Sequence, residues 1–284
     1  MSENKPIIAF MYDFDKTLCT KDMQEYTFIP NLGTTSEEFW KESGELAKEN
    51  KMDGILAYMY IMREKARSSH IPVRRDDFVK LGKDLEFFPG VPSWFDRINR
   101  IGEEQEVIIE HYIISSGLRE IIEGSSIYDK FHAVFACEFF YDENNVACWP
   151  KNVVNYTTKT QFLYRVNKGV LDLSKDEELN QYTPEDDRRI PFRNMVYIGD
   201  GITDVPCMKL VKVNGGYSIA VYQEGKKSAV TDFLHDNRVN YIEPADYSEG
   251  SPLENIARDI IRQMAIKDSL VRQTKAQLKE IGRG

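Results

Sequence analysis

Short apolar runs alternate with amphipathic segments along this chain, and this alternation restricts its fold more than any other feature. The amphipathic segments have the spacing of helices, and each apolar run ends at polar or glycine-bearing turns. Buried strands alternating with helices are typical of a parallel α/β sheet. We therefore predict a doubly wound, Rossmann-like parallel sheet. The apolar runs are Ile7–Tyr12, Val107–Ile114, Ala133–Cys137, Met195–Ile198 and Ser218–Tyr222, and helical spacing is clear in Trp94–Ile101, Gln161–Val166 and Leu253–Leu278.

Composition narrows the class of protein further. Hydrophobic residues make up 42% of the 284 residues and charged residues 29%, which excludes disordered, collagen-like and disulfide-built chains. The formal net charge of −9 argues against non-specific binding to nucleic acid or to an anionic membrane. The four cysteines form no CxxC pair, and the first apolar run is too short for a signal peptide or a membrane span. We expect a soluble protein of the cytoplasm.

One connection in the predicted sheet is much longer than a single crossover helix. Thr17 and Ser115 are separated by about 100 positions, whereas a βαβ unit needs about 30. The surplus carries helical patterns: a capping box at Thr35–Glu38, apolar residues spaced along 55–66, and a further helix near 78–85. We predict that residues 20–87 form an inserted helical domain and that residues 1–19 and 88–284 form the core.

Four polar motifs follow the predicted strands or begin the next helices. They are Asp13-Phe14-Asp15-Lys16-Thr17, Ser115-Ser116-Gly117, Lys159, and Gly199-Asp200-Gly201-Ile202-Thr203-Asp204. Taken singly, each has an ordinary explanation as a turn, a helix cap or a surface lysine. Ligands bind beyond the carboxyl ends of parallel strands, so motifs in these positions are expected to converge on one site. Carboxylates gathered there suit Mg²⁺, and a hydroxyl beside backbone amides suits an anion.

In order, these motifs resemble the four motifs of the haloacid dehalogenase superfamily of phosphohydrolases. The resemblance covers residues 7–20 and about 88–244. It implies a Mg²⁺-dependent phosphatase that hydrolyses a small phosphorylated metabolite through an aspartyl-phosphate intermediate. Dehalogenases lack the second aspartate of the first motif, so Asp15 indicates phosphorus chemistry.

The resemblance also implies a role for each motif residue. Asp13 is the nucleophile, and Asp15 protonates the leaving group and then activates water. Mg²⁺ is held by Asp13, Asp200 and the main-chain carbonyl of Asp15, while Asp204 orients Lys159 or a metal-bound water. The expected phosphate-binding residues are Thr17, Ser115, Ser116 and Lys159.

The predicted insertion resembles the small helical cap of phosphoserine phosphatases, which reads the leaving group. Those enzymes place a glutamate shortly after the first motif and an arginine in the cap. Asp22 lies near the first position, and Arg63 and Arg67 are candidates for the second, although the local sequences differ. A phosphoserine-like substrate is therefore one possibility. A phosphotransferase and a non-catalytic phosphate-binding regulatory module remain open as alternatives, and no feature indicates an oligomeric state.

Overall fold

A seven-stranded sheet forms the centre of the computed structural model, which describes residues 5–71 and 73–282. The strand order is β4-β3-β2-β1-β5-β6-β7, and all neighbouring strands are parallel except the β3–β4 hairpin. The predicted doubly wound α/β fold is thus confirmed, with an antiparallel strand at one edge. The strands are β1 Ile7–Tyr12, β2 Ile108–Leu118, β3 Ala133–Tyr141, β4 Ala147–Asn152, β5 Met195–Gly199, β6 Tyr217–Tyr222 and β7 Tyr241–Pro244.

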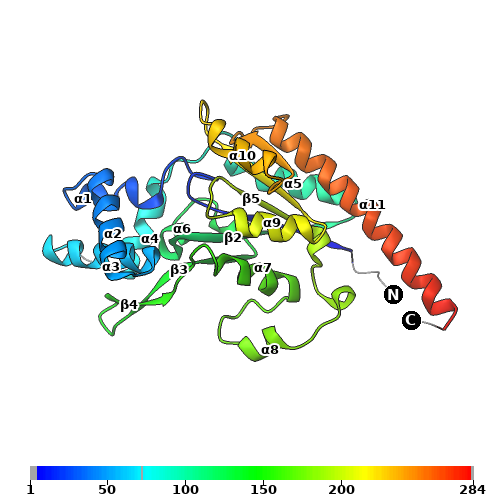
Figure 1. Cartoon of the computed structure of the whole chain (residues 1–284), viewed down its shortest axis with the longest axis horizontal. Coiled ribbons are helices and arrows are strands. Elements are labelled where there is room, and N and C mark those ends of the chain that lie inside the picture. The colour runs from blue at the N-terminus through cyan, green and yellow to red at the C-terminus, as the bar shows by residue number, and fades with distance from the viewer. Residues whose placement is uncertain (1–4, 72, 283–284) are drawn as a thin grey trace.

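Helices cover both faces of this sheet. Figure 1 shows α5 and α11 packed together on one side and α7 and α9 on the other. In the described part of the chain, no helix is both long and apolar enough to cross a membrane. The helices are α1 Phe28–Asn31, α2 Ser36–Asn50, α3 Gly54–Ser68, α4 Arg75–Leu81, α5 Val91–Glu104, α6 Arg119–Glu123, α7 Lys159–Lys168, α8 Asp176–Asn180, α9 Val205–Val213, α10 Ser228–His235 and α11 Pro252–Glu280.

The central strand β1 is buried along nearly its whole length, as expected for a parallel strand covered on both faces. From β1 the chain builds the sheet outward through β2 and β3, and β5 then returns to the other side of β1. The carboxyl ends of β1 and β5 therefore lie side by side where the strand order reverses. Such a reversal leaves a crevice in which α/β proteins bind ligands, and Asp13 and Asp200 follow the two strands directly.

Residues 20–87, which we call the helical insertion, contain α1 to α4 and lie at one end of the molecule beside the β3–β4 hairpin (Figure 1). The capping box of α2 is formed, because Glu38 N donates to Thr35 Oγ1 at 3.2 Å and Thr35 N donates to Glu38 Oε2 at 3.1 Å. The last of these helices, α4, packs closely on α6, where a Cβ on Gly124 would lie 1.7 Å from the Val79 carbonyl oxygen. The division into core and inserted domains stays a prediction.

Candidate active site

Lys159 links the end of β1 to the start of α9. Its Nζ lies 2.9 Å from Asp13 Oδ1 and 2.7 Å from Asp204 Oδ1, and all three residues are buried. Burial alone would lower the pKa of Lys159, but the charges of Asp13 and Asp204 outweigh it and raise that pKa above its usual value. The ammonium group therefore stays charged, and it partly offsets the negative charge that gathers at this edge of the sheet.

Asp204 is fully enclosed by hydrogen-bond donors. Its Oδ1 accepts from Lys159 Nζ and from the Tyr197 hydroxyl at 2.9 Å, and its Oδ2 accepts from Gly201 N at 3.2 Å. A Cβ on Gly199 would lie 2.6 Å from the Asp204 carboxyl group, so only glycine fits there without a shift. Because both oxygens are engaged by the protein, Asp204 is placed to orient Lys159.

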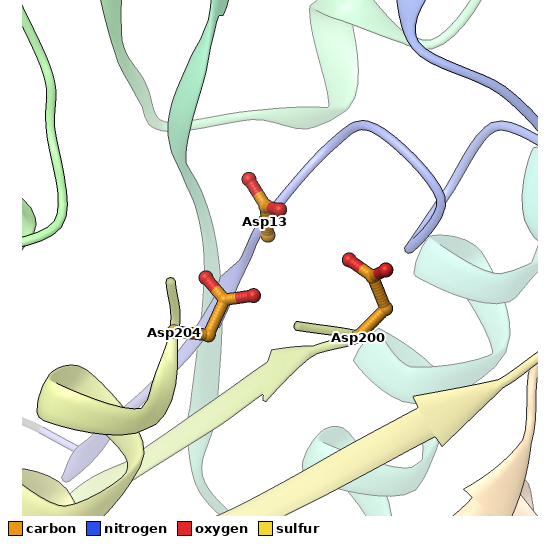
Figure 2. Close-up of side chains that lie close together, drawn as sticks. All are labelled: Asp13, Asp200 and Asp204. Carbon is orange, nitrogen blue, oxygen red and sulfur yellow. The ribbon is translucent and has the colours of Figure 1, made fainter. Parts of the chain in front are cut away.

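Three carboxyl groups meet beyond the ends of β1 and β5. Oxygens of Asp13, Asp200 and Asp204 lie within 4.8 Å of one another, and Figure 2 shows the three side chains gathered around a common space. Burial, together with the neighbouring carboxylates, raises the pKa of Asp13 to about 7 and that of Asp200 to about 8. Oxygen ligands held close together against their own repulsion fit a hard divalent cation such as Mg²⁺.

Thr17 lies beneath this carboxylate group and supports it. Its Oγ1 donates to Asp200 Oδ1 at 3.2 Å, and its carbonyl oxygen accepts from the Tyr247 hydroxyl at 2.8 Å. The Thr17 side chain is fully buried. The structure therefore shows Thr17 holding Asp200, whereas the sequence had predicted that it binds phosphate; that role stays a prediction.

Asp15 sits in a pocket between the sheet edge and the helical insertion. Its Oδ1 accepts from Met23 N at 2.8 Å. Burial, and next the charges of Asp22 and Asp13, raise the pKa of Asp15 well above its usual value. Asp22 also lines the pocket, with Lys16 Nζ 2.5 Å from its Oδ2. A carboxyl group whose pKa is raised by its surroundings is suited to act as a general acid.

The two serines of the second motif lie in different surroundings. Ser115 Oγ is buried and accepts from Gly117 N at 2.9 Å. Ser116 lines the pocket, and its buried Oγ has no hydrogen-bond partner among the described residues. An unpaired buried hydroxyl is costly unless a ligand completes its bonding. Ser116 therefore has an unused hydroxyl at the pocket, whereas Ser115 does not line it.

The pocket measures about 330 Å³ and has several walls that the sequence did not predict as functional. Arg63 and Arg67 on α3 do not line it within the described chain, while Asp22 does. The unpredicted lining residues include Lys16, Gln24, Trp40, Ile55, Tyr58 and Tyr156. None of these further lining residues is among the site residues predicted from the sequence.

Comparison with known proteins identifies the family to which the chain belongs. The family described as haloacid dehalogenase-like hydrolase matches residues 10–209. A Borreliella burgdorferi protein, described as uncharacterized, is 33% identical over 285 residues, which cover 90% of this chain and 96% of that protein.

Solved structures share the fold at low identity. A substrate-bound phosphoserine phosphatase is 16% identical with a TM-score of 0.53, covering 86% of this chain and 96% of its own. A probable phosphoserine phosphatase from Vibrio cholerae is 12% identical with a TM-score of 0.55, covering 93% of this chain and 67% of its own. A third structure, from Salmonella enterica serovar Typhi and described as a hydrolase of this family, is 15% identical with a TM-score of 0.53, covering 84% and 67%.

Proposed function

This chain belongs to the haloacid dehalogenase-like hydrolases, and on that premise we propose that it is a Mg²⁺-dependent phosphatase acting on a small phosphomonoester. One observation carries the proposal: two carboxyl groups, Asp13 and Asp15, line the same pocket with different charged neighbours. Asp13 has the Lys159 ammonium at 2.9 Å, while Asp15 has carboxylate neighbours that favour its protonated form. Such a pair supplies a nucleophile and an acid at the same pH.

The reaction uses these two groups in sequence. A carboxylate oxygen of Asp13 attacks phosphorus while the bond between phosphorus and the leaving oxygen breaks, and Asp15 gives its proton to that oxygen. The product is an alcohol and an aspartyl phosphate at Asp13. Asp15, now ionised, takes a proton from a water whose oxygen attacks phosphorus, which releases inorganic phosphate and restores Asp13.

Other residues bind and orient the phosphoryl group. Ser116 Oγ donates to its oxygens because this hydroxyl lacks a protein partner among the described residues. Lys159 Nζ also donates to them because it lies beside Asp13. We assign Ser115 and Thr17 to support, because neither lines the pocket and their side chains hold Gly117 N and Asp200.

The metal site is proposed from the same carboxylates. Asp13, Asp200 and the main-chain carbonyl of Asp15 would hold Mg²⁺, while Asp204 keeps Lys159 in place. The ion would neutralise phosphoryl oxygens and favour ionisation of Asp13.

We also propose a small soluble metabolite as substrate and the cytoplasm as location. The pocket volume is that of a small-molecule site. All four cysteines are free, and three of them are buried, which is consistent with a reducing compartment.

The test is phosphate release from a panel of phosphomonoesters with Mg²⁺, with EDTA, and with Mg²⁺ restored. We expect EDTA to abolish turnover. Asp15→Asn should slow esters of poor leaving groups far more than p-nitrophenyl phosphate, whose leaving group needs little protonation. Asp259→Asn, on a side chain that is 77% exposed on α11, is the matched control. Turnover that resists EDTA, or transfer of the phosphoryl group to added alcohols in place of water, would contradict the proposal.

A further inference from the structure

A second pocket of about 480 Å³ adjoins the proposed active site and shares Trp40, Ile55, Tyr58 and Tyr156 with it. Its walls come from α2, from the start of α3 and from residues 155–157, which precede α7. Asn155 Nδ2 donates to Asp53 Oδ2 at 2.8 Å and so fastens the helical insertion to the core across this space. Asp13 and Asp15 line the first pocket, so the second pocket offers room to a leaving group that extends beyond it.

Two aromatic rings in the shared wall are held in fixed orientations. Trp40 Nε1 donates to Glu25 Oε1 at 2.8 Å, and the Tyr58 hydroxyl donates to the Ser116 carbonyl at 2.7 Å. The rings meet edge to face, with their centroids 5.8 Å apart. Because Trp40 is already fixed by Glu25 and Tyr58, a ligand that packs on its ring does not have to immobilise this side chain. The wall therefore suits a flat apolar group.

Among the residues that the structure describes, the two pockets offer a carboxylated substrate no cation that lacks an acidic partner. Among the described residues that line either pocket, the cationic side chains are Lys16 and Lys159. Lys16 is paired with Asp22 at 2.5 Å, and Lys159, which is paired with Asp13 and Asp204, is assigned to the phosphoryl group. A substrate carboxylate normally requires a charged partner such as arginine. The lining therefore argues against an amino-acid leaving group of the phosphoserine kind.

Gln24 provides a polar contact of a different type. It lines the first pocket from the 3-10 turn Met23–Glu25 and is only 2% exposed. Its Oε1 has no hydrogen-bond partner in the described structure. A carboxamide both donates and accepts, so it matches a hydroxyl or an N–H group of an uncharged ligand.

From these contacts we propose that the leaving group is an uncharged alcohol carrying a flat ring, the chemistry shared by nucleosides and aryl alcohols. The ring packs on Trp40, which Glu25 and Tyr58 hold in place, and a hydroxyl or N–H of the ligand reaches Gln24. The inference rests on the proposed phosphatase function, since it assigns the alcohol that this site releases.

The experiment compares kcat/KM for five substrates in Mg²⁺: acetyl phosphate, a nucleoside 5′-monophosphate, phenyl phosphate, phosphoserine and phosphocholine. Acetyl phosphate has no ring and reports the phosphoryl chemistry alone. We expect a ring-bearing substrate to exceed phosphoserine and phosphocholine by about tenfold or more, the scale of one stacking contact.

Substitutions of Trp40 and Gln24 test which pocket residues cause the preference for ring-bearing substrates. Trp40→Leu should lower kcat/KM for ring-bearing substrates about tenfold more than it lowers kcat/KM for acetyl phosphate, and circular dichroism checks that the variant is folded. Trp40→Phe, which keeps a ring, should restore most of the loss. Gln24→Leu should impair the nucleotide but not phenyl phosphate, which lacks a group for the carboxamide, and so separates the two sources of ring. Trp149→Leu, at a 70% exposed tryptophan that lines neither pocket, is the matched control.

Each possible result of these measurements supports or contradicts a stated proposal. Preference for phosphoserine would overturn the inference, and preference for phosphocholine would do so by assigning the aromatic wall to a cation. Hydrolysis of acetyl phosphate with no preference for a ring overturns the inference alone. Failure to hydrolyse any of the five phosphates overturns the proposed function itself.

Discussion

The Nζ of Lys159 lies 2.9 Å from Oδ1 of Asp13, so the first residue of α7 is bonded to the residue that follows β1. Both side chains are buried. Burial raises the pKa of Asp13, and the ammonium opposes that rise. The pair therefore decides whether the proposed nucleophile is ionised at neutral pH before any metal binds.

Replacing Lys159 tests this pair. Lys159→Met leaves the carboxylates of Asp13 and Asp204 without their cation, so we expect the free energy of unfolding at pH 7.5 to fall by about 3–5 kcal/mol. Phosphatase activity should fall by about a hundredfold or more, because the charge also stabilises the transition state. Urea unfolding and phosphate release measure the two effects, with Lys209→Met on the exposed side of α9 as control. A Lys159→Met protein as stable as the control would contradict this account.

Mg²⁺ affinity should depend on pH because its proposed ligands hold protons unusually well. The pKa is raised to about 7 for Asp13 and about 8 for Asp200, from an ordinary 3.8. A ligand must lose its proton to bind the ion, so affinity should fall as pH falls from 8 to 6, by about tenfold per pH unit for each proton released. Calorimetry in buffers of different ionisation enthalpy counts those protons. Binding that is independent of pH would show that these carboxyl groups are already ionised.

The same pKa values predict how the metal-free protein responds to pH. Asp13 and Asp200 lose their protons at a higher pH in the folded state than in the unfolded chain. Their protonated forms therefore contribute to stability in full below about pH 4, the pKa of the unfolded chain. This contribution declines as pH rises through 7 and 8. Added Mg²⁺ should therefore raise the melting temperature more at pH 8 than at pH 6, and Asp200→Asn should remove most of that difference.

The two adjacent serines should respond differently to substitution. Ser116→Ala removes a hydroxyl that has no partner among described residues, so we expect a loss of turnover of about tenfold to a hundredfold with stability kept, the scale of one donor to the phosphoryl group. Ser115→Ala removes the acceptor of Gly117 N and should chiefly lower stability, by about 1 kcal/mol. Comparable effects on turnover would mean that both serines bind phosphate.

The close packing of α4 on α6 predicts a contrast between two glycines. Gly124→Ala places a Cβ 1.7 Å from the Val79 carbonyl oxygen, and we expect destabilisation of about 3 kcal/mol. Gly44 lies inside α2, and a Cβ added there would meet nothing within 4 Å in the described structure, so Gly44→Ala should stabilise by about 0.5–1 kcal/mol. Chemical denaturation of both variants checks the contrast, and equal effects would place α4 away from α6.

The sheet could be predicted from the sequence because buried parallel strands consist of continuous apolar runs, as in β1. The β7 strand escaped prediction because its four residues lie at the sheet edge and none of them is buried. The sequence also did not predict which of Ser115 and Ser116 faces the pocket. The reason is that β2 is irregular between Ile114 and Leu118, so its side chains do not simply alternate between the two faces there.

Residues of the helical insertion were harder to assign because their direction depends on how its helices dock. Tyr58 points to the pocket from α3, whereas Arg63 and Arg67 follow it by five and nine positions. At about 100° per residue these arginines lie roughly 140° and 180° around the helix from Tyr58. Nothing local in the sequence says which face of α3 meets the core, and the arginines were candidates only because phosphoserine phosphatases have an arginine in the cap. Gln24 gave no signal because a lone glutamine matches no motif.

The account depends most on Asp13 as the residue that carries the phosphoryl group. The direct measurement is to quench the enzyme in acid during turnover and locate the phosphoryl group by mass spectrometry of its peptides. We expect it on the peptide that contains Asp13, labile to hydroxylamine as an acyl phosphate is, and absent from Asp13→Asn, which should also be inactive. A phosphoryl group on another residue, or an Asp13→Asn protein that turns over substrate at the unmodified rate, would contradict the account.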